Sequence, residues 1–174
     1  TSFLSLPKHL LREMIARSST FQTLIGAGGT EAQMITQARA KVHLTAMHDF
    51  ETWTAPRPFF LITGPMPAEA RHDNGYTGAD SGTLQTYFEM AIPTEYSGDD
   101  EQDVADAETY LLNTYGAIIM EVLELCGTDY DATRTYPIFQ TAPMEYAPMR
   151  SDKREGEGGE YWQIIQDWNY GNNE

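Results

Sequence analysis

Two neighbouring stretches decide the fold: residues 83–92 read TLQTYFEMAI, and residues 100–125 read DEQDVADAETYLLNTYGAIIMEVLEL. In the first stretch, apolar residues alternate with polar ones. Strict alternation over this length predicts a β-strand with one buried face. The residues that share the predicted inward parity are Leu84, Thr86, Phe88, Met90 and Ile92.

The second stretch has the 3.6-residue period of an amphipathic helix. Ser97 can cap its start, and the acidic residues of 99–103 lie where the helix dipole favours negative charge. Gly127 is placed to end it. About 25 residues at 1.5 Å each give ~37 Å, enough to cross a sheet. The predicted apolar stripe comprises Val104, Ala107, Leu111, Tyr115, Ile118, Ile119, Val122 and Leu125.

Weaker patterns flank these two elements. Helical spacing covers 7–25, with a possible break at 18–20, and one or two further helical turns fit 31–38. Strands are predicted at 41–47, 58–63, 133–145 and 161–170. Because Pro137 and Pro143 interrupt residues 133–145, we expect that strand at an edge or with a bulge. In the last strand, Trp162, Ile164 and Trp168 share a parity and are expected in the sheet core.

The order of these elements predicts a single α+β domain over residues 1–174. We expect a mostly antiparallel sheet of about five strands, with one long and one or two short helices packed on one face. Two long loops are predicted, at 64–82 and 149–160, where Gly, Pro and charged residues gather without an apolar period.

Charge excludes several classes of function. The chain has 26 Asp and Glu against 11 Lys and Arg, a net charge of −15. Proteins that grip DNA, RNA or an anionic membrane need a basic face. A single cysteine, Cys126, allows no intrachain disulfide and no thiolate zinc cage. No apolar run approaches the ~20 residues of a membrane span.

Motifs for catalysis and cofactor binding are missing from the sequence. Residues 26–30 (GAGGT) lack the third glycine of a dinucleotide loop and follow a helix instead of a strand. The pairs His48-Asp49 and His72-Asp73 are half-sites for a metal without a second pair of ligands. No nucleophile elbow is present. We therefore predict no enzyme, no catalytic residue, no cofactor and no metal site.

The order of elements resembles a known class of protein. The segments that carry the resemblance are, in chain order, LLREM (10–14), STFQTLIG (19–26), RPFFLI (57–62), GTL (82–84), and GEYWQ (159–163) with DW (167–168). This order is similar to tail terminator (tail completion) proteins at the head–tail interface of tailed bacteriophages. The resemblance implies a virion protein of the tail and neck, assembled in the host cytoplasm.

The resemblance also implies partners. We expect a homo-oligomeric ring, a homohexamer, which caps the tail tube, ends tube polymerisation and joins a head–tail connector or stopper protein. DNA would pass through an acidic lumen without specific binding, and no membrane is involved. Unprotected sheet edges such as 84–92 could pair between subunits. The residues predicted at subunit or partner interfaces are Arg71, Asp73, Arg150, Asp152, Lys153, Arg154 and Glu155.

Two alternatives stay open. A connector or head-completion ring nearer the portal differs from a terminator in its binding partner. A small α+β enzyme or ligand-binding domain could use the 64–82 loop as a lid over His72 and Asp73.

Overall fold

The structure is a computed structural model, and it describes residues 6–44, 56–66, 81–96, 100–131, 134–151 and 159–171. Within them, the helices are α1 (Leu6–Ala16), α2 (Ser19–Leu24), α3 (Glu31–Ala40), the 3-10 helix η1 (Thr94–Tyr96) and α4 (Glu101–Leu125). The strands are β1 (Val42–Leu44), β2 (Phe59–Met66), β3 (Ser81–Ala91), β4 (Asp129–Asp131), β5 (Arg134–Thr135), β6 (Phe139–Ser151) and β7 (Gly159–Gly171).

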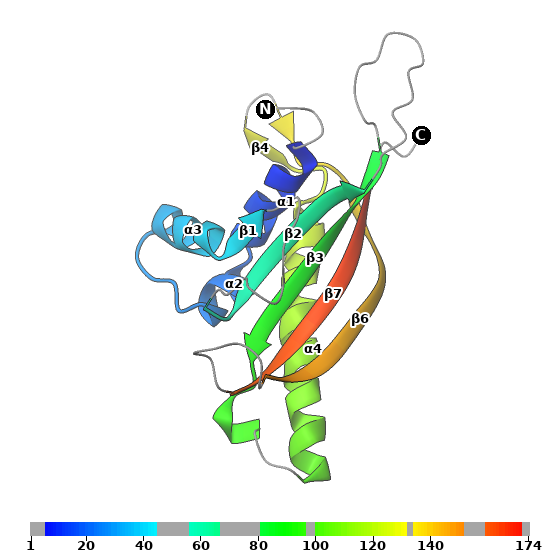
Figure 1. Cartoon of the computed structure of the whole chain (residues 1–174). Coiled ribbons are helices and arrows are strands. Elements are labelled where there is room, and N and C mark those ends of the chain that lie inside the picture. Colours follow the sequence, from blue (N-terminus) through cyan, green and yellow to red (C-terminus); the bar gives the residue numbers. More distant parts are fainter. Residues whose placement is uncertain are drawn as a thin grey trace.

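Five of these strands form one sheet in the order β1-β2-β3-β7-β6 (Figure 1). The pair β1–β2 is parallel, and the pairs β2–β3, β3–β7 and β7–β6 are antiparallel. β4 and β5 pair separately. The predicted α+β class with a mostly antiparallel sheet of five strands is confirmed.

One apolar core joins the helices to a single face of the sheet. The alternation in β3 places Leu84 and Phe88 in this core, and β7 contributes Ile164 and Trp168 on the matching parity, as predicted. α1, α2, α3 and α4 all supply side chains to the same cluster. Figure 1 shows α4 lying along the sheet, and its length lets it follow the strands almost from end to end.

Aromatic rings fix how the helices sit on the strands. The Phe60 ring of β2 lies 5.1 Å from Phe21 of α2 and 4.7 Å from Phe88 of β3, between ring centroids. Tyr115 of α4 lies 5.5 Å from Phe88. Such tilted and edge-on pairs contribute beyond their buried area. Four elements that are distant in sequence therefore meet at one point.

Three short α-helices precede the sheet, where one or two were expected. The hydroxyl of Ser18 accepts a hydrogen bond from the backbone N–H of Phe21, and this cap starts α2 as a separate helix. Thr30 and Gln33 form a reciprocal capping box that starts α3.

The long helix begins three residues later than Ser97, the residue that the sequence favoured as its cap. Asp100 is the N-cap, and its carboxylate accepts the backbone N–H of Asp103 at 2.8 Å. Ser97 lies outside the described residues. At the other end Cys126 is the C-cap, and Gly127 follows with a φ of +74°, a left-handed conformation that suits glycine.

The strand positions confirm some expectations and correct others. β6 is an edge strand, and its register shifts between Thr141 and Met144, around Pro143, as predicted. It begins at Phe139, later than the predicted 133. β3 lies between β2 and β7, so the idea that residues 84–92 form an unprotected edge is wrong.

The strands beside the two predicted loops extend further than expected. β2 runs to Met66 and β3 begins at Ser81, while β6 runs to Ser151 and β7 begins at Gly159. Residues 67–80 and 152–158 lie outside the described residues.

The cap of α4 can be tested by substitution. We expect Asp100→Ala to lower the free energy of unfolding by about 1 kcal/mol, because one backbone N–H of the first turn loses its acceptor. Ser97→Ala should change it by less than about 0.5 kcal/mol. Urea unfolding followed by circular dichroism measures both. A larger loss in Ser97→Ala than in Asp100→Ala would contradict the assignment.

Candidate functional site

The amino-terminal turns of α4 project beyond the end of the sheet (Figure 1). The apolar stripe of the helix continues into this projection. Val104 belongs to the stripe but is 49% exposed, whereas Ala107 is 4% exposed and Leu111 is fully buried. The sequence pattern predicted Val104 as a core residue, and the structure corrects this, because the strands end before they reach it.

Other apolar side chains lie at the same end of the sheet as Val104. η1 follows β3 at the same end of the sheet, and the ring of its Tyr96 lies 5.4 Å from that of Tyr110 on α4. Ile92 at the end of β3 is half-buried, as are both tyrosines. We call these four residues, Ile92, Tyr96, Val104 and Tyr110, the end patch.

Acidic residues border the end patch. Glu95 on η1 and Glu101 and Asp106 on α4 are exposed. Glu101 lies three residues before Val104 on the helix, a spacing that makes the two side chains neighbours. Residues 100–131 contain nine Asp and Glu and no Lys, Arg or His. An apolar centre with a charged rim is the usual anatomy of a protein–protein contact, and this rim is negative.

The opposite end of the helical layer is basic. Residues 6–44 contain five Lys and Arg against two Glu, a net charge of +3. Glu13 of α1 is paired with Arg39 of α3 through two hydrogen bonds. Arg17 is exposed, and Arg12 bonds to Nδ1 of His9 at 3.3 Å. Among the described residues, neither Arg12 nor Arg17 forms an ion pair.

A buried ion pair supports the sheet face that looks away from α4. Nε of Arg57 lies 3.2 Å from Glu89, and their side chains are 8% and 0% exposed. Gln163 donates to the same carboxylate at 3.1 Å. The Arg57 guanidinium lies 3.7 Å from the centre of the Tyr161 ring, a cation–π contact. Hydrogen bonds and the Tyr161 ring thus hold both charged groups in place. These groups lie towards the same end of the sheet as the end patch, because Tyr161 is paired with Ala91, the last residue of β3.

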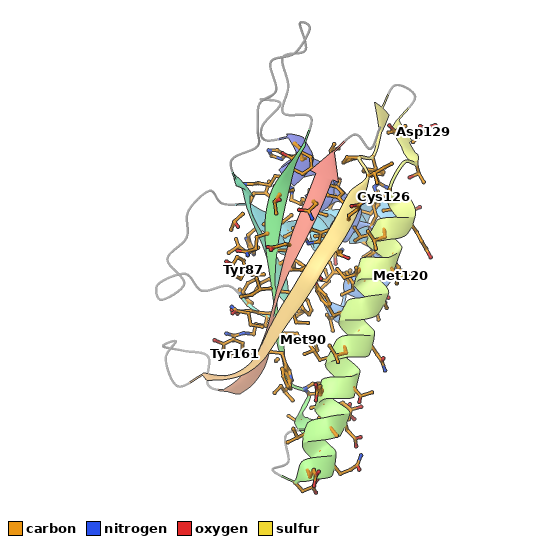
Figure 2. The ribbon with its side chains drawn as sticks, turned by 90° about the vertical axis from the view of Figure 1, so that its right-hand side faces the viewer. Tyr87, Met90, Met120, Cys126, Asp129 and Tyr161 are labelled. Atoms are coloured by element: carbon orange, nitrogen blue, oxygen red, sulfur yellow. The ribbon has the colours of Figure 1, made fainter. Side chains whose placement is uncertain are left out.

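Polar pairs continue along this face towards the other end of β3 and β7. Gln85 donates to Asp167 at 3.0 Å, and Thr83 donates to Asn169 at 2.9 Å. Figure 2 shows Tyr87 on this side of the sheet, while Met120 lies on α4 on the other side. Polar side chains on this face thus bind one another in cross-strand pairs, and the apolar Phe59 and Leu61 of β2 are fully buried on the same face.

Three hydroxyl residues hold α2 against α4. The carboxylate of Glu121 accepts hydrogen bonds from the hydroxyls of Ser18, Ser19 and Thr20 and from the backbone N–H of Thr20. Burial of the carboxyl opposes its ionisation, but these hydrogen bonds outweigh it and lower the pKa of Glu121. Beside them lies an open pocket of about 270 Å³, lined by Ser19, Thr20, Thr23, Leu24, Tyr110 and Thr114.

Of the residues predicted at interfaces, the structure describes only the backbone of Arg150. It pairs with Glu160 next to the β6–β7 tip, at the same end of the sheet as Ala91. Arg71, Asp73, Asp152, Lys153, Arg154 and Glu155 lie outside the described residues, as do His48, Asp49 and His72. The sequence reasoning missed the end patch. The acidic residues at 99–103 indicate a helix start, and their pattern alone does not predict an exposed apolar patch beside them.

Within the described ranges, no group of three or more His, Cys, Asp and Glu side chains could hold a metal ion. His43 of β1 is half-buried against Phe59, and burial, followed by the charge of Lys41, lowers its pKa. None of the helices described here is both long enough and apolar enough to span a bilayer.

Comparison with known proteins gives no relative: no family model and no curated protein matches this chain.

The buried ion pair should dominate the stability of the polar sheet face. We expect Glu89→Gln to lower the free energy of unfolding by about 3–5 kcal/mol, because it removes the buried anion opposite Arg57. The double variant Arg57→Met/Glu89→Leu should recover most of this loss. Asp167→Asn, on the same face but half-exposed, is the matched control and should cost under about 1 kcal/mol. Equal losses in Glu89→Gln and Asp167→Asn would refute this.

The Glu121 contact predicts a pH dependence. Because the folded-state pKa of Glu121 is lowered, its stabilisation is present above the unfolded-state pKa of about 4.3 and is lost as the pH falls through the folded value. Glu121→Gln should cost about 0.5–1 kcal/mol at pH 7, since the group is largely solvated, and less at about pH 3. Urea unfolding at both pH values measures this. A difference from wild type that grows in acid would contradict it, and Glu124→Gln is the exposed control.

Proposed function

We propose that this chain is a structural subunit of the neck of a tailed phage, of the tail terminator type. In this proposal, copies of the chain form a ring of about six that caps the tail tube and joins the head connector. The order of elements that resembles tail terminators supports the proposal, and so does one structural observation, the separation of charge along the helical layer.

This separation favours a self-assembling subunit. One end of α4 has an apolar patch with an acidic rim, and the α1 end carries arginines that lack an acidic partner among the described residues. Two unlike surfaces on one subunit favour heterologous contacts, which close into a ring when the rotation permits. The net charge of −15 suits a conduit, because an acidic wall repels DNA phosphates and lets the duplex slide.

The proposal predicts the native mass of the purified chain. Alone or with tail tube subunits, it should reach a closed species of about six copies, measured by light scattering and negative-stain microscopy. DNA should not be retained, even at low salt, because no counterions are released on contact.

Binding partners separate this proposal from its nearest alternative. A ring that binds the portal-side ring and ignores tube subunits would indicate a connector protein. A chain that remains monomeric under all these conditions, and binds neither ring, would contradict both.

A further inference from the structure

We propose that the end patch of one copy packs on the outer face of α1 in the next copy, so that the subunits join head to tail. This inference rests on the proposed ring and names the contact that closes it. We call the receiving surface, formed by His9, Leu10, Arg12 and Arg17, the α1 shoulder.

At its amino-terminal end, α4 leaves part of its apolar stripe exposed. The stripe that α4 buries against the sheet continues to Val104, where 49% of the residue is exposed. The half-buried Ile92, Tyr96 and Tyr110 extend this apolar area over the end of the sheet. An apolar area with exposed carboxylates around it calls for a partner that is apolar in part and basic at its rim.

The acidic rim narrows the possible partners. Carboxylates repel the phosphates of nucleic acids and of anionic lipids. The fitting partner is therefore a basic protein surface. The chain carries basic residues of this kind itself, because Arg12 on α1 is half-buried and Arg17, just after α1, is exposed.

The arginines of the α1 shoulder are available for such a contact. Arg12 bonds to His9, and its buried Nε has no hydrogen-bond partner. Arg17 is exposed and forms no ion pair among the described residues. A carboxylate from a neighbouring copy would supply both with an anion.

Arg17 and the acidic rim at Glu101 lie far apart on one chain. Arg17 adjoins Ser18, whose hydroxyl binds Glu121 on α4. Glu101, beside the end patch, lies twenty residues earlier on the same helix, which corresponds to about 30 Å along its axis. A contact that joins these two separate surfaces once per subunit is heterologous and gives a ring or a filament.

Charge reversal tests this contact. The acid-reversed variant is Glu95→Lys/Glu101→Lys, and the base-reversed variant is Arg12→Glu/Arg17→Glu. Each variant has like charges on both surfaces, so we expect the protein concentration for half-maximal assembly to rise at least about tenfold. A 1:1 mixture should assemble as wild type does, with the two variants alternating, because every contact then joins opposite charges.

Matched controls keep the test specific. Glu124→Lys makes the same charge change on an exposed position of α4 away from the end patch, and should assemble normally. Val104→Asp should impair assembly, whereas Met120→Asp, at a residue that is 59% exposed, should not. If Arg12→Glu/Arg17→Glu fails to fold, as judged by circular dichroism, Arg17→Glu alone replaces it as the base-reversed variant.

Light scattering and native mass spectrometry separate the outcomes. Loss of assembly in each variant, with recovery in the mixture, supports the contact. If wild type forms rings and the acid-reversed variant does so equally well, the contact is overturned and the ring proposal stands. If each variant loses assembly and the 1:1 mixture does not recover it, the α1 shoulder is not the surface that the end patch binds. If wild type never assembles, with or without tube subunits, the contact and the proposed function both fail.

Discussion

The structure depends on the apolar contact between α4 and the two central strands. Tyr115, Phe88 and Phe60 stack in sequence from the helix to β2, and Phe21 of α2 closes the group at its far side. Burial raises the pKa of the Tyr115 hydroxyl, so that group stays neutral in the core. With its position fixed here, a 25-residue helix leaves its amino-terminal turns beyond the strands. The exposed Val104 follows directly from this placement.

The two faces of the sheet are stabilised in different ways. Towards the helices, apolar side chains and rings fill the interior, and the buried indole N–H of Trp168 donates a hydrogen bond to the hydroxyl of Thr86. Away from the helices, Arg57, Glu89 and Gln163 form a network in which each charge is held by several groups. Such a network is costly to disturb, and this favours one register for β3 and β7.

The end patch, with its acidic rim, and the basic α1 shoulder are the two surfaces that the proposed assembly would use. Rim charges chiefly set the orientation and rate of association, while the apolar centre supplies affinity. Edge pairing is a poor route for this chain, because the long edge strand β6 contains a register shift and two prolines, Pro143 and Pro148. For the proposed assembly we therefore favour side-chain contacts between unlike surfaces.

The sequence alone is enough to predict the hydrophobic periodicity of single elements and the net charge of the chain. Alternation at 84–92 and the helical stripe of 104–125 predicted two elements, their inner faces and the α+β class, because each pattern reports burial within its own element. Other features depend on contacts between residues far apart in sequence, so they could be seen only in the folded structure. They are the central position of β3, the parallel pairing of β1, the ion pair of Arg57 with Glu89 and the exposure of Val104. A stripe shows which face of a helix is apolar. It cannot show where the opposing sheet ends, since strand pairing between residues far apart in sequence sets that limit.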